Sequence, residues 1–238
     1  MTTFVLVHGA MHGGWCWRDV RGQLVEHGHT VFTPTLTGQG DRRHLLTPDV
    51  GIGTHVQDLA DLLWFEDLDD VCLVLHSYAG LLAGPLVDIA ADRIRMIIHM
   101  GSMVGRPGEC TLDVQPPETA ARYRGLVERD HHGGRIPASD DFLTQWGLTD
   151  PAHRAWVGPR LTDFPFRCLS DPIFFDEAKL AAVRQIYVRH TDPPLHNRDR
   201  SYERAVAAGW EVHDLATSHD LMVVDPDATA AILERLAP

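Results

Sequence analysis

Short apolar runs alternate with longer amphipathic stretches along most of this chain. The apolar runs have the length of buried strands, and they cover residues 4–7, 30–33, 71–75, 94–100, 185–190 and 210–215. Helical spacing of apolar residues is found over residues 15–27, 54–64, 78–91 and 226–236. Because strands that alternate with helices build parallel sheets, the pattern predicts an α/β fold. We expect a mostly parallel six-stranded sheet with helices on both faces.

The alternation stops between residues 104 and 180, in an interval with many Pro, Gly and aromatic residues. We interpret this interval as a lid inserted before the last two strands, so that residues 1–103 and 181–238 form the two parts of one core domain. Aromatic side chains of such a lid either line an apolar pocket or pack the lid onto the core. They are Trp146, Trp156, Phe164, Phe166, Phe174 and Phe175.

A serine stands where the third apolar run ends, in the sequence His76-Ser77-Tyr78-Ala79-Gly80. A turn between a strand and a helix exposes such a hydroxyl at the carboxyl edge of the sheet. The helix amino terminus behind it offers N–H groups to developing negative charge. We interpret Ser77 as a nucleophile, although a serine here can also merely cap the helix. The usual pattern is Gly-x-Ser-x-Gly, and Leu75 and Ala79 occupy its glycine positions.

A glycine-rich turn, His-Gly-Ala-Met-His-Gly-Gly-Trp over residues 8–15, follows the first apolar run. Such a turn beside the serine exposes N–H groups that hold the oxyanion of a tetrahedral intermediate. The expected donors are the main-chain amides of Ala10 and Tyr78. The alternative is an ordinary loop between a strand and a helix. His12 either contacts substrate at the mouth of the pocket or has a structural role in this turn.

His219 follows the last predicted strand, where an imidazole can take the proton of a serine and later return it. Asp192 follows the preceding strand and is the expected carboxylate that orients this base. The order Ser77, Asp192, His219 is the order of α/β-hydrolases. Residues 191–195 also suit an ordinary turn, in which aspartate is common. Glu109 and Asp113 are the alternative acids.

With these motifs in place, the chain resembles the α/β-hydrolase superfamily over nearly its whole length, and most closely the small branch of methyl esterases and hydroxynitrile lyases. The resemblance rests on residues 4–15 and on Asp220-Leu221-Met222 after the histidine. Residues 32–46 are similar to a bacterial subgroup that includes an esterase acting on a benzimidazole carbamate fungicide. The resemblance implies a cofactor-independent serine esterase that acts on small carboxylic esters or carbamates through an acyl-enzyme.

Departures from these relatives separate the possible reactions. The lyases use a threonine of the first turn and a lysine beside the catalytic histidine, and Gly9 and Asp220 take those positions here. Without that cation, a cyanide leaving group has no electrostatic support, so we favour hydrolysis. Gly101 also replaces an aspartate that is common after the corresponding strand. Acyl transfer, cyclisation or another lyase reaction on the same residues stays open, as does a binding protein with a decayed site.

Charge and composition narrow the range of partners. The chain has 33 acidic and 21 basic residues and a formal net charge of −12, which argues against nucleic acid. We interpret the short basic stretches at residues 42–43 and 198–204 as solvated surface. Neither an export segment before Phe4 nor a membrane-spanning apolar run is expected. The sequence predicts a soluble, cytoplasmic enzyme whose partner is a small-molecule ester, and leaves a homodimer open.

No metal or disulfide is expected. Adjacent His131 and His132 have no third ligand at a useful spacing. The four cysteines are widely separated and form no Cys-x-x-Cys pair. They are Cys16, Cys72, Cys110 and Cys168.

Overall fold

The computed structural model describes residues 1–130 and 134–237. A sheet of six parallel strands in the order β2-β1-β3-β4-β7-β8 forms its centre. The strands are β1 (Thr3–Val7), β2 (Thr30–Phe32), β3 (Val71–His76), β4 (Ile94–Met100), β7 (Arg184–His190) and β8 (Glu211–Leu215). Each lies where the apolar runs predict it, which confirms the predicted fold class.

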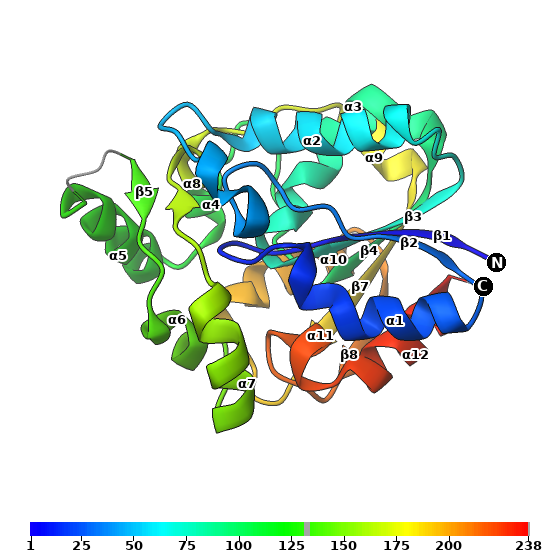
Figure 1. Ribbon diagram of the computed structural model, residues 1–238. Helices are drawn as coiled ribbons and strands as arrows, with labels where there is room; N and C mark the ends of the chain where they lie inside the picture. The colour runs from blue at the N-terminus through cyan, green and yellow to red at the C-terminus, as the bar shows by residue number, and fades with distance from the viewer. Residues whose placement is uncertain (131–133, 238) are drawn as a thin grey trace.

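Helices cover both faces of this sheet (Figure 1). On one face α1 (Arg18–Glu26) packs against α12 (Pro226–Leu236), and on the other α2 (Ile52–Phe65) packs against α3 (Ala83–Ala90). Short 3-10 turns lead into two of these helices, namely η1 (Gly14–Trp17) before α1 and η3 (Ser77–Leu82) before α3. The remaining short elements of the core are η2 (Gly40–Leu45), η4 (Ala91–Arg93), η6 (His196–Arg198) and α11 (Leu221–Val224).

Local sequence explains why the central elements form. Every residue of β3 is buried, as expected of a central parallel strand that is covered on both faces and has no polar alternation. At the start of α12, the Asp225 carboxylate accepts a hydrogen bond from the Ala228 amide, and Pro226 occupies the first turn. Both features favour a helix start at this position.

One core helix, α10 (Asp199–Ala207), is absent from the predicted set. It packs against β7 and β8. The residues that it buries are Ser201 and Ala205, which are both small. The buried face of α10 is therefore made of small residues, and the charged residues around it give residues 199–207 the composition of a solvated surface.

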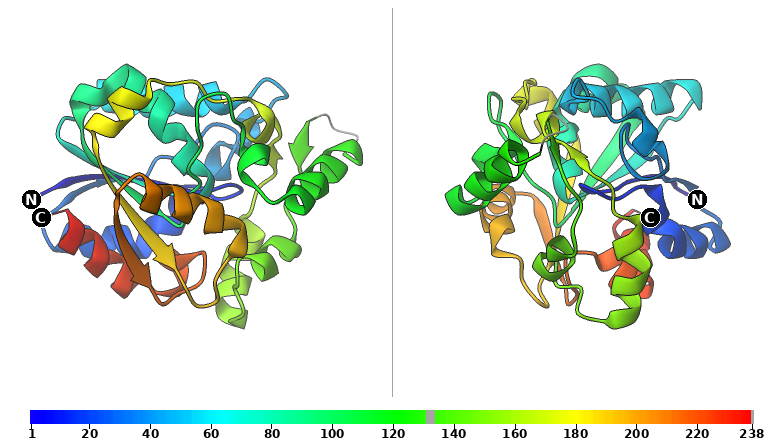
Figure 2. Two further views of the ribbon diagram at one scale, coloured as in Figure 1. Left: turned by 180° about the vertical axis from the view of Figure 1, so that it is seen from behind. Right: turned by 60° about the vertical axis from the view of Figure 1, so that its left-hand side comes forward.

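The expected insertion lies between β4 and β7. Its elements are α4 (Thr111–Val114), α5 (Pro117–Glu128), β5 (Arg135–Ile136), α6 (Asp140–Gln145), α7 (Pro151–Val157), η5 (Gly158–Arg160), β6 (Phe164–Pro165), α8 (Arg167–Ser170) and α9 (Glu177–Ala182). The segment from α5 to α7 and the antiparallel pair β5–β6 lie at the end of the molecule opposite the two termini (Figures 1 and 2). The last helix, α9, returns to the core and packs against α3.

No helix in the described part of the chain has the length and apolar character needed to cross a membrane.

Candidate active site

Ser77 stands at a strained turn directly after β3. Its φ of +55° lies in the left-handed region that side chains other than glycine rarely adopt. The loop after β4 stabilises this turn, since the Ser102 hydroxyl donates a hydrogen bond to the Leu75 carbonyl and the Met103 amide donates to the Ser77 carbonyl at 2.9 Å. Leu75 is fully buried in place of the usual glycine. The strained turn of a nucleophile elbow thus forms with Leu75 in the sequence, and Ser77 itself is buried, with 5% of its surface exposed.

The first glycine-rich turn packs directly against this elbow. A Cβ atom at Gly9 would lie 2.8 Å from the Ser77 Cβ and 2.9 Å from the His76 Nδ1, so any larger residue at position 9 would displace the elbow. His8 anchors the turn, because its Nδ1 donates to the Gly9 carbonyl at 2.7 Å and its Nε2 accepts from the Leu36 amide at 3.0 Å. Burial lowers the pKa of His8 to about 3, which keeps the ring neutral.

Ala10 and Tyr78, the expected oxyanion donors, both border the cavity that contains Ser77. Tyr78 follows Ser77 in the first turn of η3, where amide groups have no acceptor within the helix. The Tyr78 ring is buried, and its hydroxyl is hydrogen bonded to the Nδ1 of His55 at 3.1 Å. Its phenol therefore has a packing role in the wall.

His219 is brought to Ser77 as expected. Its Nε2 lies 2.9 Å from the Ser77 Oγ. Two hydrogen bonds fix the backbone of His219, one from its amide to the Trp146 carbonyl at 3.1 Å and one from the Nε2 of His76 to its carbonyl at 2.9 Å. His76 is thus a positioning residue that sequence reasoning missed, although it directly precedes the serine.

The electrostatic surroundings keep His219 in its neutral form. Burial, together with nearby His190, His76 and Arg198, lowers its pKa well below the ordinary value of 6.5. A neutral imidazole with a free lone pair on Nε2 is the form that accepts the proton of a serine hydroxyl. The structure therefore places a neutral imidazole in hydrogen-bonding contact with the Ser77 hydroxyl.

Asp192 is not brought to His219. Its side chain is exposed, and its amide donates to the Thr217 carbonyl at 3.0 Å. The His219 Nδ1 is buried and has no hydrogen-bond partner among the described residues. The ring of His190, the last residue of β7, lies beside the His219 ring with centroids 4.7 Å apart.

The backbone of Gly101 closes the same space. A Cβ atom at this position would lie 2.6 Å from the His190 Nδ1 and 3.4 Å from the His219 Nδ1. The Gly101 backbone and the His190 ring therefore fill the region beside His219 Nδ1. The physical reason for the difference from the expectation is that β7 ends with an inward imidazole, whereas Asp192 lies two residues further along and faces solvent.

The alternative acids have other partners. Glu109 accepts two hydrogen bonds of 2.7 Å from the guanidinium of Arg204, and Asp113 accepts one of 2.8 Å from the Cys110 amide at the start of α4. Neither hydrogen bonds to His219.

His12 forms a buried ion pair with a carboxylate that the sequence places next to the base. Its Nε2 lies 3.3 Å from an oxygen of Asp220, and both side chains are almost fully buried. Burial lowers the pKa of His12, but the Asp220 carboxylate more than reverses this, so the net shift is upward. His12 is not among the described residues that line the Ser77 cavity. The structure thus favours the structural role that the sequence left open for His12.

Arg198 corrects the interpretation of residues 198–204 as solvated surface. The residue is 6% exposed, and its Nη2 donates a hydrogen bond of 3.1 Å to the Ser77 Oγ. Sequence reasoning missed it because an arginine among alternating acids and bases looks like a surface residue. The one available signal was its position, since Arg198 lies in the same loop as Asp192, the expected acid.

The Ser77 cavity is small and mostly apolar. Its volume is about 30 Å³, which is room for one or two water molecules. Of the aromatic residues singled out in the insertion, Trp146 and Phe164 line it. Phe174 is 68% exposed, and Phe175 packs against Gly84 on the core. Within residues 1–130 and 134–237, the lining is Ala10, Met11, Ser77, Tyr78, Met103, Tyr123, Ile136, Phe142, Trp146, Phe164, Leu169 and Arg198.

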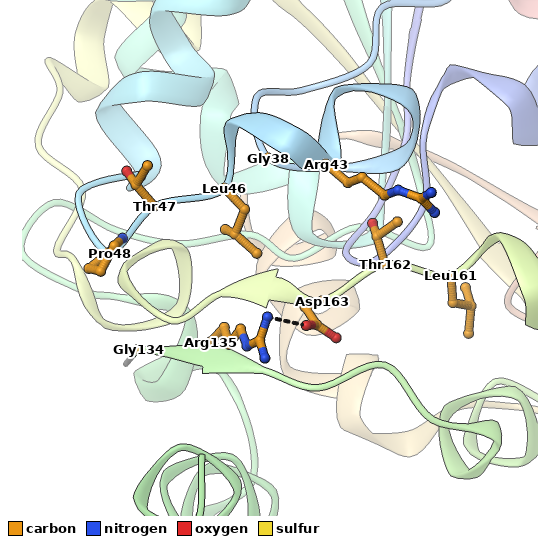
Figure 3. Close-up of a pocket in the computed structure, with 10 residues that line it drawn as sticks. All are labelled: Gly38, Arg43, Leu46, Thr47, Pro48, Gly134, Arg135, Leu161, Thr162 and Asp163. Atoms are coloured by element: carbon orange, nitrogen blue, oxygen red, sulfur yellow. Dashed lines mark ion pairs between the residues drawn. The ribbon is translucent and has the colours of Figure 1, made fainter. Parts of the chain in front are cut away.

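A larger surface cavity, of about 380 Å³, lies between the η2 region and the β5–β6 pair (Figure 3). Arg135 and Asp163 form an ion pair of 2.8 Å in its wall. None of its described lining residues also lines the Ser77 cavity, and these residues do not pair a nucleophile with a base.

The pattern of the alpha/beta hydrolase family matches residues 4–232. The chain belongs to the alpha/beta hydrolase family. It is 33% identical over 247 residues to a carbendazim hydrolyzing esterase of Nocardioides sp. (strain SG-4G), a match that covers 99% of this chain and all of that protein. Methylesterase 9 of Arabidopsis thaliana is 31% identical over 67% of this chain and 59% of its own length. These relatives support ester hydrolysis as the class of reaction.

Solved structures share the fold of this alpha/beta hydrolase. An extracellular alpha/beta-hydrolase from a Paenibacillus species superposes with a TM-score of 0.89 at 19% identity, over 100% of this chain and 99% of the other. A methylesterase from Arabidopsis superposes with a TM-score of 0.79 at 22% identity, over 99% and 98% of the two chains.

No group of three or more His, Cys, Asp or Glu side chains is placed to hold a metal ion within residues 1–130 and 134–237. His131 and His132 lie outside the described residues. The four cysteines are free and buried.

Proposed function

We propose that this protein is a serine esterase that cleaves a small carboxylic ester or carbamate through an acyl-enzyme on Ser77. The observation that supports the proposal most strongly is the distance of 2.9 Å between the Ser77 Oγ and the His219 Nε2, on a strained elbow at the wall of a cavity. The names of the relatives, a carbendazim hydrolyzing esterase and a methylesterase, support the substrate class.

In the proposed mechanism, His219 takes the proton of Ser77 as the Oγ attacks the ester carbonyl. The amides of Ala10 and Tyr78 donate hydrogen bonds to the oxyanion. His219 then gives the proton to the leaving alcohol, and water releases the acyl group by the same route.

The base works in this proposal without a hydrogen-bonded carboxylate. His219 is held by its backbone bonds to Trp146 and His76, and its ring packs against His190. A role for Asp192 as the acid would require residues 191–195 to turn its carboxylate inward. We therefore assign the chemistry to Ser77 and His219 and treat Asp192 as a separate prediction.

We also propose that the insertion acts as a lid. Residues from α5, α6 and the β5–β6 pair supply Tyr123, Phe142 and Phe164 to the cavity wall. Because a volume of about 30 Å³ cannot hold an ester, these side chains must move outward when substrate binds. The free, buried cysteines fit the expected reducing, cytoplasmic surroundings.

Hydrolysis of short-chain p-nitrophenyl esters and aryl carbamates tests the proposal. We expect the wild type to turn over part of this panel and Ser77→Ala to lose the activity. Ser139→Ala is the matched control, because Ser139 is exposed and makes no capping hydrogen bond at the start of α6. Turnover that is unaffected in Ser77→Ala, or none at all in the wild type, would reject the proposal.

A further inference from the structure

Arg198 is a buried cation whose hydrogen-bond partners are all neutral. Its Nη2 donates to the Ser77 Oγ at 3.1 Å, and its Nη1 donates to the Asn197 Oδ1 at 3.1 Å and the Asn197 carbonyl at 3.4 Å. The Nε is buried without a partner. Burial lowers the pKa of this guanidinium, and the nearby groups that oppose the shift are two tyrosines and no carboxylate.

Arg204, in the following helix, shows the contrasting case. Its side chain is 10% exposed and forms a two-pronged pair with Glu109, with both N–O distances at 2.7 Å. Burying a charge is costly unless an opposite charge or good hydrogen bonds compensate for it. The fold supplies a carboxylate to Arg204 and none to Arg198, so the counter-charge of Arg198 must come from outside the described chain.

The position of Arg198 indicates that the substrate supplies this counter-charge. Among the described residues that line the Ser77 cavity, Arg198 is the one with a charged side chain. The same cavity is lined by Ile136, Phe142 and Leu169, whose side chains carry no hydrogen-bonding group. A charge in an apolar, water-poor cavity attracts an opposite charge strongly. An anion bound there would lie within a few ångströms of the ester carbonyl attacked by Ser77.

We propose that Arg198 binds a free carboxylate on the acyl part of the substrate, so that the preferred esters are half-esters of short dicarboxylic acids. Guanidinium and carboxylate match in a planar, two-pronged geometry. When Arg198 binds this carboxylate, its Nη2 no longer donates to the Ser77 Oγ, and the hydroxyl is free to attack the ester. This inference rests on the proposed esterase function and adds the chemistry of the acyl group.

Methanol release from two matched esters tests the inference. Monomethyl glutarate carries the free carboxylate, and dimethyl glutarate is its neutral counterpart. We expect the wild type to favour the monomethyl ester by at least about tenfold in kcat/KM, as a charge-assisted pair provides. Arg198→Met should remove this preference, so that its kcat/KM is about equal for the two esters, and Arg198→Lys should keep part of the preference.

Arg189→Gln is the matched control, since Arg189 is a half-exposed arginine paired with Asp214 and its loss changes the net charge equally. It should keep the wild-type preference. Two results would overturn the inference: equal kcat/KM for both esters in the wild type, or an equal loss on both esters in Arg198→Met. The second result would mean that the Arg198 guanidinium stabilises the oxyanion or the folded structure and does not bind the substrate carboxylate.

If Arg198→Met does not fold, inhibition of the wild-type enzyme by a free dicarboxylate tests the role of Arg198 instead. Glutarate should inhibit hydrolysis of the dimethyl ester competitively, and at least about tenfold more strongly than neutral glutaramide. Equal inhibition would reject the role of Arg198. Failure of the esterase proposal is distinguishable, because the wild type would then hydrolyse neither methyl ester nor any member of the p-nitrophenyl panel.

Discussion

The two nitrogens of the His219 ring have very different surroundings. Nε2 lies 2.9 Å from the Ser77 Oγ, whereas Nδ1 is buried without a hydrogen-bond partner. The Nε2 side is built from the elbow after β3, the first glycine-rich turn and the loop after β4, which hold one another in place. The Nδ1 side meets the ring of His190 and the backbone of Gly101.

In the proposed mechanism, the contacts on the Nε2 side carry the chemistry. A carboxylate on the Nδ1 side normally fixes the tautomer of the base and stabilises the imidazolium. Here the main-chain contacts of His219 supply the orientation, and Arg198 near the site disfavours the imidazolium. We therefore expect large effects from changes on the Nε2 side and small effects from changes to the exposed Asp192.

The largest expected effect follows removal of the proposed base, His219. His219→Gln should lower kcat/KM for an ester by at least about a thousandfold, because the serine loses its proton acceptor. Steady-state kinetics on a p-nitrophenyl ester measure it. His213→Gln is the control, since His213 lies on β8 and pairs with Glu211 away from the cavity. Equal rates for wild type and His219→Gln would contradict the assignment of the base.

Asp220→Asn should affect stability more than catalysis. It removes the carboxylate that pairs with the buried His12, so that the ring loses its partner and is neutral in the variant; this costs about 2 kcal/mol in unfolding free energy and lowers Tm by about 6 °C in a chain of this size. We expect kcat/KM to fall less than about tenfold. Thermal unfolding measures the change, with the exposed Asp214→Asn as control. An unchanged Tm with a loss of activity near ten-thousandfold would instead identify Asp220 as the carboxylate that orients His219.

The pH dependence of kcat/KM should show the electrostatics around the base. The base form is the neutral ring, and burial with nearby His190, His76 and Arg198 lowers the His219 pKa below 6.5. Activity on a neutral ester should therefore be complete at neutral pH and fall only as pH drops through that lowered pKa. Arg198→Met removes one of the causes, so its acid limb should move to higher pH. An acid limb above pH 6.5 in the wild type would contradict the description of the site.

The smallest effect is expected for Asp192→Asn. Because the Asp192 side chain is exposed and makes no hydrogen bond to His219, kcat/KM should stay within about threefold of the wild type. The same kinetic assay measures it, with Asp199→Asn as an exposed control. A loss near ten-thousandfold, typical of a removed triad acid, would mean that residues 191–195 turn inward during catalysis.

Local patterns in the sequence were sufficient to predict the sheet and the Ser77–His219 pair. The apolar run of β3 and the turn residues after it are contiguous, and His219 follows the last strand directly. Such signals depend on neighbours in the chain, so they can be recognised without the fold.

Side-chain direction in the loops could not be predicted in the same way. Whether Asp192 or His190 faces the base depends on how the end of β7 meets Gly101, which is remote in the sequence. Arg198 has the charge of a surface residue, and only the packed structure shows that it reaches Ser77. Small buried residues likewise concealed α10.

The most direct test of the central claim is mass spectrometry of the protein mixed rapidly with a p-nitrophenyl ester. The account predicts one added acyl group on the peptide that contains Ser77 in the wild type, and none in Ser77→Ala. An acyl group on a different residue, or turnover of the ester by the wild type without any acyl-enzyme, would contradict it.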